Sequence, residues 1–382
     1  MNAQILVVDD SGFNRLLLKR RLAELGFPEP ATATNGIEAL AAIAAQPFDV
    51  VLLDLEMPEL DGIGVLERLH AQPNPPPVIV ISAQTEMSGV IRCIELGAED
   101  YLPKSFDPPL LRARLQAVLE KKRLRDLAAE RLRALEAELE SARRAQLSLV
   151  PRDFRALSRG ALTVAAHMEP AREVGGDLYD VHWIGRRHLM FVVADVAGKG
   201  ASAGLTMARS MGLIRAAVRI ADGRGEIPDP GDLLALANAD LATDNPEMTF
   251  VTVALAIIDA ETGQGRLCVA GHEAPLRLTA QGVQVMGGYA IQPPLGIIED
   301  LAYASAPFAL APGEAMLLLS DGVTEAHDMQ GGLFGKERVL AALACETDPA
   351  TAITVLLREV AGFVREAPPA DDVTVLAVRY SG

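Results

Sequence analysis

Residues 50–54 of the chain read VVLLD, a continuously apolar run that ends in an aspartate. Two further runs of this kind occur at residues 5–8 (ILVV) and 78–81 (VIVI). Runs this short and this apolar are typical of strands that are buried on both faces of a parallel sheet. Helical patterns at residues 15–25 and 36–45 lie between them, so we expect an α/β fold with a doubly wound parallel sheet.

Several polar residues follow these runs, where the carboxyl ends of parallel strands form a ligand crevice. Asp9 and Asp10 follow the first run, and Asp54 ends the second. Three carboxylates that converge there repel one another unless a hard divalent cation such as Mg²⁺ neutralises them. Ser82 and Lys104 would bring a hydroxyl and an ammonium to the same crevice. This combination is suited to accepting and stabilising a phosphoryl group.

The local motifs around these residues resemble the receiver family of two-component response regulators. They are VVDD at 7–10, LDLEMPELDG at 53–62, SA at 82–83 and YLPK at 101–104. The resemblance implies one Mg²⁺ and a sensor histidine kinase as partner. It also implies the site residues: phosphoacceptor Asp54, metal ligands Asp9, Asp10 and Asp54, and the phosphoryl-switch residues Ser82, Tyr101 and Lys104.

A second segment, residues 116–149, contains neither glycine nor proline and has the composition of a helix. Its apolar positions follow the 4-3-4-3 spacing of a coiled-coil seam. The seam positions are Ala128, Leu132, Leu135, Leu139, Ala142, Gln146 and Leu149. The pattern favours a coiled-coil homodimer, and a single amphipathic helix docked on its own chain is the alternative.

The third segment combines strand-like runs at residues 189–194, 249–258 and 316–320 with helical patterns at 201–220 and 233–241. Strands grouped with fewer, longer helices predict a layered α/β sandwich. We therefore expect three parts. They are a receiver domain at 1–118, a helical coiled-coil linker at 119–150 and a second globular domain at 151–382.

Isolated aspartates again stand at strand ends and glycine turns in this third segment. Asp177 follows two glycines, Asp195 ends an apolar run, and Asp321 ends another. Asp371 and Asp372 open the last strand-like run. Carboxylate clusters of this kind suit Mg²⁺ or Mn²⁺ better than zinc. Two such ions would activate a water molecule and neutralise the phosphate that it attacks.

The motifs look like those of metal-dependent protein phosphatases, in the sporulation and stress-response branch. They are REVGGDLYD at 172–180, DVAGKG at 195–200, AGHEAP at 270–275, SDGVTE at 320–325 and DDVT at 371–374. The resemblance implies two Mn²⁺ or Mg²⁺ ions. It implies the catalytic residues Asp177, Asp195, Asp321 and Asp371, which also serve as metal ligands together with Asp372 and the Val196 carbonyl. Glu273 and Ala274 depart from the usual Asn-Pro without removing a ligand.

Together the two resemblances imply a response regulator in which phosphorylation of Asp54 controls a serine/threonine phosphatase. Its substrate would be a phosphoprotein such as an anti-sigma-factor antagonist. The alternative is an adaptor whose catalytically silent phosphatase-like domain captures a partner protein. A DNA-binding output fits poorly, because no helix-turn-helix pattern follows the linker.

Composition excludes several other classes. The net charge of −16 opposes binding to nucleic acid, and no apolar stretch approaches the roughly 18 residues of a membrane helix. The three cysteines, Cys93, Cys268 and Cys345, are widely spaced and predict neither a disulfide framework nor a thiolate metal site. We expect a cytoplasmic protein without a membrane partner.

Overall fold

The computed structural model describes every residue except 1–2, 84–86, 173, 244, 247 and 345. Glu173 and Cys345 of the sequence analysis therefore lie outside the described residues. The chain divides into two compact units, residues 1–135 and 136–382, which are considered separately below. In the described part of the chain, no helix is long and apolar enough to cross a membrane.

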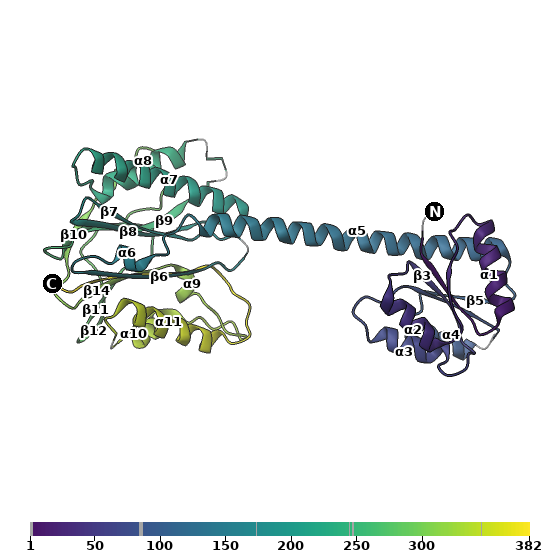
Figure 1. Ribbon diagram of the computed structural model, residues 1–382. Helices are drawn as coiled ribbons and strands as arrows, with labels where there is room; N and C mark the ends of the chain where they lie inside the picture. Colours follow the sequence, from purple (N-terminus) through teal and green to yellow (C-terminus); the bar gives the residue numbers. More distant parts are fainter. Residues whose placement is uncertain (1–2, 84–86, 173, 244, 247, 345) are drawn as a thin grey trace. The chain divides into compact units, whose positions relative to one another are not determined.

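The first unit is built on a five-stranded sheet with the order β2-β1-β3-β4-β5, in which all neighbours run parallel (Figure 1). Its strands are β1 (Ile5–Val8), β2 (Ala31–Ala33), β3 (Val50–Asp54), β4 (Val78–Ser82) and β5 (Asp100–Pro103). Its helices are α1 (Gly12–Glu24), α2 (Gly36–Ala45), α3 (Gly62–His70), α4 (Met87–Glu95) and the start of α5 (Pro108–Leu147). The doubly wound parallel sheet predicted for the receiver domain is confirmed.

Apolar side chains cover both faces of this sheet. Leu22 of α1 and Leu111 and Leu115 of α5 form the core on one face. Leu66 of α3 and Cys93 of α4 belong to the core on the other. Burying one such leucine completely stabilises a fold by about 1.5–3 kcal/mol, so the two cores fix the strands and hence the carboxyl-end crevice.

The second unit contains two antiparallel five-stranded sheets, with the orders β13-β10-β9-β8-β7 and β12-β11-β14-β15-β6. The strands are β6 (Leu162–Glu169), β7 (Leu178–Ile184), β8 (His188–Val196), β9 (Val251–Asp259), β10 (Gln264–Ala270), β11 (Leu276–Thr279), β12 (Gly282–Val285), β13 (Ala306–Ala309), β14 (Ala315–Leu319) and β15 (Val373–Tyr380). The helices are α6 (Phe154–Leu157), α7 (Ala201–Gly223), α8 (Pro230–Ala242), α9 (Asp321–Thr324), α10 (Gly335–Ala342) and α11 (Pro349–Val364).

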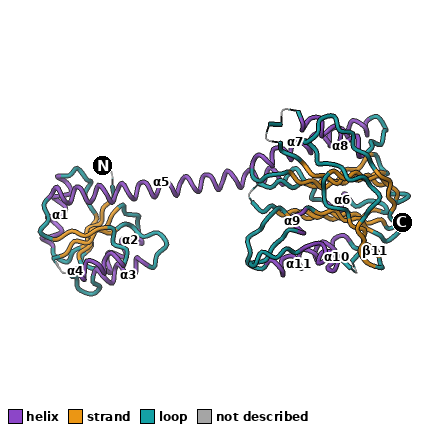
Figure 2. The backbone as a smooth tube through the Cα atoms, turned by 180° about the vertical axis from the view of Figure 1, so that it is seen from behind, coloured by secondary structure: helices purple, strands orange, loops and turns teal. Residues whose placement is uncertain are grey.

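These elements form a sandwich in which the two sheets face each other and helices cover their outer faces (Figure 2). Phe191 of β8 and Leu318 of β14 lie in the core between the sheets. Met207 of α7 packs on the outside of one sheet, and Leu356 of α11 packs on the outside of the other. The predicted α/β sandwich is therefore confirmed.

Helix α5 runs without interruption from Pro108 to Leu147 and carries the predicted apolar stripe. Leu132 and Leu135 of this stripe are more than half exposed. The end of the stripe differs from the prediction. Gln146 is buried in the second unit, and Leu149 lies beyond the end of the helix. The seam prediction was wrong at Gln146, because its amide bonds to a loop of its own chain.

Candidate functional site

The carboxyl ends of the receiver strands bring three aspartates together. Asp9 follows β1 and is buried, Asp54 ends β3 and is buried, and Asp10 is exposed. One carboxylate oxygen from each lies within 4.8 Å of the other two. Oxygen ligands at this spacing fit a hard cation such as Mg²⁺. The geometry therefore supports the predicted metal site of the receiver unit.

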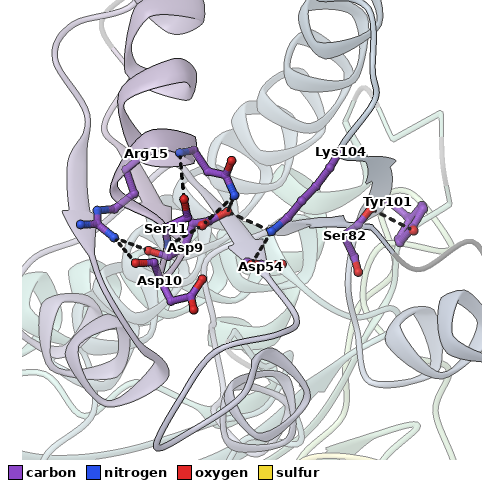
Figure 3. Close-up of polar contacts among 9 residues, drawn as sticks. Asp9, Asp10, Ser11, Arg15, Asp54, Ser82, Tyr101 and Lys104 are labelled. Atoms are coloured by element: carbon purple, nitrogen blue, oxygen red, sulfur yellow. Dashed lines mark hydrogen bonds and ion pairs between the residues drawn. The ribbon is translucent and has the colours of Figure 1, made fainter.

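Lys104 neutralises part of this charge. Its ammonium lies 2.6 Å from Asp54 Oδ2 and 3.3 Å from Asp9 Oδ2 (Figure 3). Burial raises the pKa of the Asp54 carboxyl above its ordinary value, although Lys104 opposes this. Asp54 Oδ1 is buried and has no hydrogen-bond partner among the described residues. Because Lys104 contacts Oδ2, the oxygen of Asp54 that can bind a cation or a phosphoryl group is Oδ1.

Ser82 and Tyr101 lie beside this cluster on neighbouring strands. Ser82, at the end of β4, is fully buried, and its carbonyl accepts a hydrogen bond from Lys104 N at 2.9 Å. Tyr101 on β5 directs its hydroxyl towards the same carbonyl, with an O···O distance of 3.5 Å. One backbone group thus links Lys104 to Tyr101, the predicted switch aromatic, which supports a common response of these residues.

Two polar residues of α1, which were not predicted from the sequence, hold Asp9. Asn14 Nδ2 lies 3.1 Å from both carboxylate oxygens of Asp9. Arg15 donates to the Asp9 carbonyl at 2.7 Å and to the Asp10 carbonyl at 2.9 Å. Their position in the first turn of a helix that follows two aspartates was the available signal, because side chains there face the end of the strand.

Two aspartates of the second unit lie next to one another in its interior. Asp177 precedes β7 and is almost fully buried, and Asp195 lies near the end of β8. Burial and the neighbouring Asp195 raise the pKa of Asp177 well above its ordinary value. Burial, Asp321 and Asp371 raise the pKa of Asp195 to about 7. Asp177 Oδ2 has no hydrogen-bond partner among the described residues, so a buried acceptor is left for a cation.

Asp321 and Asp371 stand nearer the surface of the same site. Burial raises the pKa of Asp321, and the carboxylates of Glu325, Asp371 and Glu273 add to this effect. Asp371 forms an ion pair with Lys199 at 2.8 Å. Lys199 belongs to the glycine turn after β8 and also donates to the Ala370 carbonyl at 2.5 Å. Lys199 thus pairs with a predicted metal ligand of the second unit, as Lys104 does in the first unit.

Asp372 has different contacts from the other four. Its Oδ1 accepts a hydrogen bond from Ala171 N at 2.7 Å. Its Oδ2 accepts from Gly176 N at 2.6 Å and from Asp177 N at 3.2 Å. Because both oxygens already bind backbone N–H groups, these contacts favour a positioning role for Asp372 over direct coordination of a metal.

The Val196 carbonyl lies against the same turn. A Cβ atom on Gly176 would lie only 2.8 Å from that carbonyl oxygen, so only glycine lets the turn approach it this closely. The predicted ligands of the second unit are thus gathered at one site. Among the described residues, however, only the three receiver aspartates bring three ligand atoms within 4.8 Å. Like-charged carboxylates repel one another, and Lys199 compensates the charge of Asp371.

A cavity of about 410 Å³ opens beside Asp321. Its lining includes His272, the ion pair between Glu273 and Lys336 at 2.8 Å, and the fully exposed Ile291. His272 Nδ1 lies 2.9 Å from Thr252 Oγ1. Burial lowers the pKa of His272 to about 4, so the ring is neutral at physiological pH. These contacts favour a packing role for His272 over proton transfer.

The affinity of this site for Mn²⁺ should increase with pH. The pKa of Asp195 is raised from 3.8 to about 7, so the metal-free folded protein holds a proton there which the unfolded chain has already lost. The stability of the metal-free fold therefore falls as the pH rises from 3.8, the ordinary pKa of the carboxyl, to about 7. A cation binds the carboxylate and must release that proton, so the affinity for Mn²⁺ should rise by about tenfold or more per pH unit as the pH approaches 7.

Calorimetric titration with Mn²⁺ in buffers of different ionisation enthalpy measures both the affinity and the proton release. Full-length protein carrying Asp10→Asn and Asp54→Asn should be used, because these changes remove two receiver ligands. The comparison is Asp195→Asn in this background, which lacks this carboxylate and should bind Mn²⁺ more weakly and with a smaller release of protons. An affinity that does not change with pH below about 7 would contradict the prediction.

Comparison with known proteins agrees with this architecture. Residues 5–116 match the family described as response regulator receiver domain, and residues 185–381 match the family described as Stage II sporulation protein E (SpoIIE). Fold and family matches define the class: a receiver domain joined to a domain with the fold of PP2C-type phosphatases. The second match spans more than half of the chain, and the chain belongs to the Stage II sporulation protein E family.

Curated relatives match parts of the chain. Protein IcfG of Synechocystis sp. is 27% identical over 270 residues, which are 63% of this chain and 41% of that protein. The probable transcriptional regulator ycf27 of Porphyridium aerugineum is 39% identical over 118 residues, which are 31% of this chain and 48% of that protein. The chain thus spans less than half the length of these two relatives.

Solved structures share the fold of the second unit. The PP2C domain of SiaA from Pseudomonas aeruginosa has a TM-score of 0.57 at 22% identity, and the match covers 66% of this chain and 99% of that chain. A SpoIIE fragment from Bacillus subtilis, with its PP2C phosphatase domain, has a TM-score of 0.50 at 21% identity, covering 58% of this chain and 64% of that chain. At these identities the likeness establishes the fold alone.

Proposed function

We propose that the chain is a response regulator whose phosphorylation at Asp54 controls a metal-dependent serine/threonine phosphatase. The observation that carries this proposal is the pair Asp177 and Asp195. The carboxylates of the buried Asp177 and the partly buried Asp195 have strongly raised pKa values, and Asp177 Oδ2 lacks a hydrogen-bond partner among the described residues. Burying such a pair costs stability unless a cation compensates the charge. That cost in stability supports the interpretation that the two carboxylates are present to bind cations.

The phosphatase site would use these residues as follows. Asp177, Asp195, Asp321 and Asp371, with the Val196 carbonyl, would hold two Mn²⁺ or Mg²⁺ ions. Bound divalent ions supply an activated water molecule and neutralise the phosphate that it attacks. Asp372 would keep the Asp177 turn in place through its three backbone contacts. The cavity beside Asp321 has the location expected for the segment around a phosphoserine or phosphothreonine.

The receiver site would accept a phosphoryl group from a sensor histidine kinase. An oxygen of Asp54 forms the new bond to phosphorus while the donor nitrogen leaves, and Lys104 pairs with the added negative charge. Mg²⁺ held by Asp9, Asp10 and Asp54 would neutralise the remaining charge. Ser82 would bind a phosphoryl oxygen, and Tyr101 would follow it. The contact that both Lys104 and Tyr101 make to the Ser82 carbonyl supports this coupling.

Among the remaining elements of the proposal, the substrate class rests on the resemblance described above, and the others rest on sequence patterns and composition. These elements are the domain boundaries, a cytoplasmic location, a homodimer through the stripe of α5, and a phosphoprotein substrate such as an anti-sigma-factor antagonist. The exposed Leu132 and Leu135 support the dimer. A phosphorylation-controlled adaptor is the second candidate. The ion pair between Lys199 and Asp371 favours the adaptor, because Lys199 neutralises part of the charge of a predicted metal ligand.

Continuity of α5 supplies a route for control, since one helix runs from the receiver core to the second unit. Inserting Gly-Pro after Ala129 should abolish the effect of beryllofluoride on phosphatase activity, because proline costs a helix interior about 3 kcal/mol and glycine about 1. The measurement is hydrolysis of a phosphopeptide with and without beryllofluoride.

The matched control is a seven-residue helical insertion at the same point. Seven residues are close to two helical turns, so the control returns the helix to nearly the same face. The helical route fails if the Gly-Pro variant responds to beryllofluoride as strongly as the unmodified protein does.

A further inference from the structure

The last turn of α5 carries a glutamine that makes a paired contact with the phosphatase fold. Gln146 is buried, and its Nε2 donates to the Gly175 carbonyl at 2.6 Å. Its Oε1 accepts from Gly175 N at 3.0 Å. A single side-chain amide thus satisfies both polar backbone groups of one residue. Among side chains, only asparagine and glutamine offer a donor and an acceptor in this planar arrangement.

The residue held in this way is part of the metal-site turn. Gly175 is two positions before Asp177, whose Oδ2 is the buried oxygen without a hydrogen-bond partner among the described residues. Asp372 holds the next two residues of the turn from the other side, through Gly176 N and Asp177 N. A Cβ atom on Gly175 would lie only 2.4 Å from Asp372 Oδ2. The turn therefore lies between the amide of Gln146 and the carboxylate of Asp372.

Further contacts from the same segment fix the far side of Asp177. Tyr179 donates its hydroxyl to the Pro151 carbonyl at 2.6 Å. Arg215 donates to the Leu149 carbonyl and pairs with the buried Asp180 at 2.6 Å. Contacts from residues 146–151 thus reach positions on both sides of Asp177. A shift of this segment would move the ends of the turn that carries the ligand.

We infer that Gln146 is a positioning residue that holds the Asp177 carboxylate against Asp195 and thereby sets the affinity of the phosphatase site for divalent cations. The inference rests on the proposed function, since it assigns a metal to this site. Gln146 acts through the Gly175 backbone and touches no reacting atom. The contact between Gln146 and Gly175 is also the point at which the helical route described above would reach the metal site.

Calorimetric titration of the full-length protein with Mn²⁺ tests this role without measuring catalysis. The background again carries Asp10→Asn and Asp54→Asn. Gln146→Leu removes both hydrogen bonds at nearly constant volume and should weaken Mn²⁺ binding by about tenfold or more, the equivalent of about 1.4 kcal/mol or more. Gln146→Glu keeps an acceptor for Gly175 N but loses the donor to the Gly175 carbonyl. It should also weaken binding and keeps the fold accessible if the leucine variant unfolds.

Two controls separate positioning from a loss of structure. Ser148→Ala removes the hydroxyl contact to the Ala145 carbonyl in the same turn and should leave Mn²⁺ affinity unchanged. Tyr380→Phe removes the hydrogen bond from the Tyr380 hydroxyl to the Glu261 carbonyl and should lower thermal stability, while the Gly175 contact is kept. A positioning role requires that the Gln146 variants lose much more affinity than Tyr380→Phe at equal loss of stability.

The outcomes are distinct. Weaker binding in both Gln146 variants supports the inference. Unchanged affinity in folded Gln146→Glu and Gln146→Leu, or a loss no greater than that of a Tyr380→Phe protein of equal stability, overturns it. If the protein with an intact Gln146 binds no Mn²⁺ in this background, the metal site itself fails, and with it the proposed function.

Discussion

Replacing Asp195 with alanine should lower Mn²⁺-dependent hydrolysis of a phosphopeptide by about a thousand-fold. Asp195 interacts with Asp177, and the charges of Asp321 and Asp371 help to raise its pKa. Its loss removes a carboxylate that would hold the cations. The transition-state stabilisation from metal ions is worth several kcal/mol, and each 1.36 kcal/mol changes the rate tenfold. The measurement is phosphate release at saturating Mn²⁺.

A matched control for this variant is Glu299→Ala, which removes an exposed carboxylate elsewhere in the same unit. It should retain full activity. Thermal unfolding should also be compared, because deleting one member of a repelling carboxylate pair stabilises the metal-free fold. Asp195→Ala protein that unfolds at a higher temperature yet hydrolyses the peptide at the original rate would contradict the proposed role of Asp195.

Replacing Asp54 with asparagine should abolish both covalent phosphorylation and the response to beryllofluoride. The amide cannot form the acyl phosphate, and Lys104 loses the charged partner that lies 2.6 Å away. Intact-protein mass measured after incubation with a small phosphodonor and Mg²⁺ should show no added phosphate. The ratio of phosphatase activities with and without beryllofluoride should fall to about one, the value for a protein without receiver control.

Asp61→Asn is the matched control, because this residue lies in the same loop. Its Oδ1 caps α3 by accepting from Gly64 N at 2.8 Å, and asparagine caps equally well. This variant should be phosphorylated normally. If Asp54→Asn protein still gains one phosphate, another residue is the acceptor. If it gains none but responds to beryllofluoride, the receiver site does not act through Asp54.

Local sequence patterns were sufficient for much of the fold. The runs at residues 50–54 and 78–81 form β3 and β4, because a strand buried on both faces must be apolar throughout. The pattern at 36–45 forms α2 with the predicted limits. Short or edge strands such as β12 and β13 were not predicted. Their half-exposed residues carry no continuous apolar signal, and pairing with a neighbouring strand defines them.

The residues of the candidate site also divide into those that local sequence patterns predicted and those that they did not. Asp54, Asp177 and Asp195 were found because glycine turns and strand ends mark them in the sequence. The pairing of Lys199 with Asp371 joins residues far apart in the chain, and no local pattern encodes it. Gln146 was assigned to a coiled-coil seam because its spacing fits a heptad. Only tertiary packing reveals that its amide binds Gly175 instead.

The two units also differ in how completely their charges are balanced. In the receiver, Lys104 contacts two of the three clustered carboxylates. In the second unit, Lys199 contacts Asp371, while Asp177 and Asp195 keep strongly raised pKa values. Cation binding should therefore relieve more carboxylate repulsion at the second site than at the first. The cation occupancy of the second site should also depend more strongly on pH.

The central claim is that the receiver gates a metal-dependent phosphatase, and activity of the full-length protein tests it most directly. Hydrolysis of a phosphothreonine peptide should be measured with Mn²⁺ and with chelator, each with and without beryllofluoride and Mg²⁺. We predict turnover that requires Mn²⁺ and changes with beryllofluoride. Turnover absent in every condition, while beryllofluoride still binds the receiver, would contradict the claim and favour the adaptor.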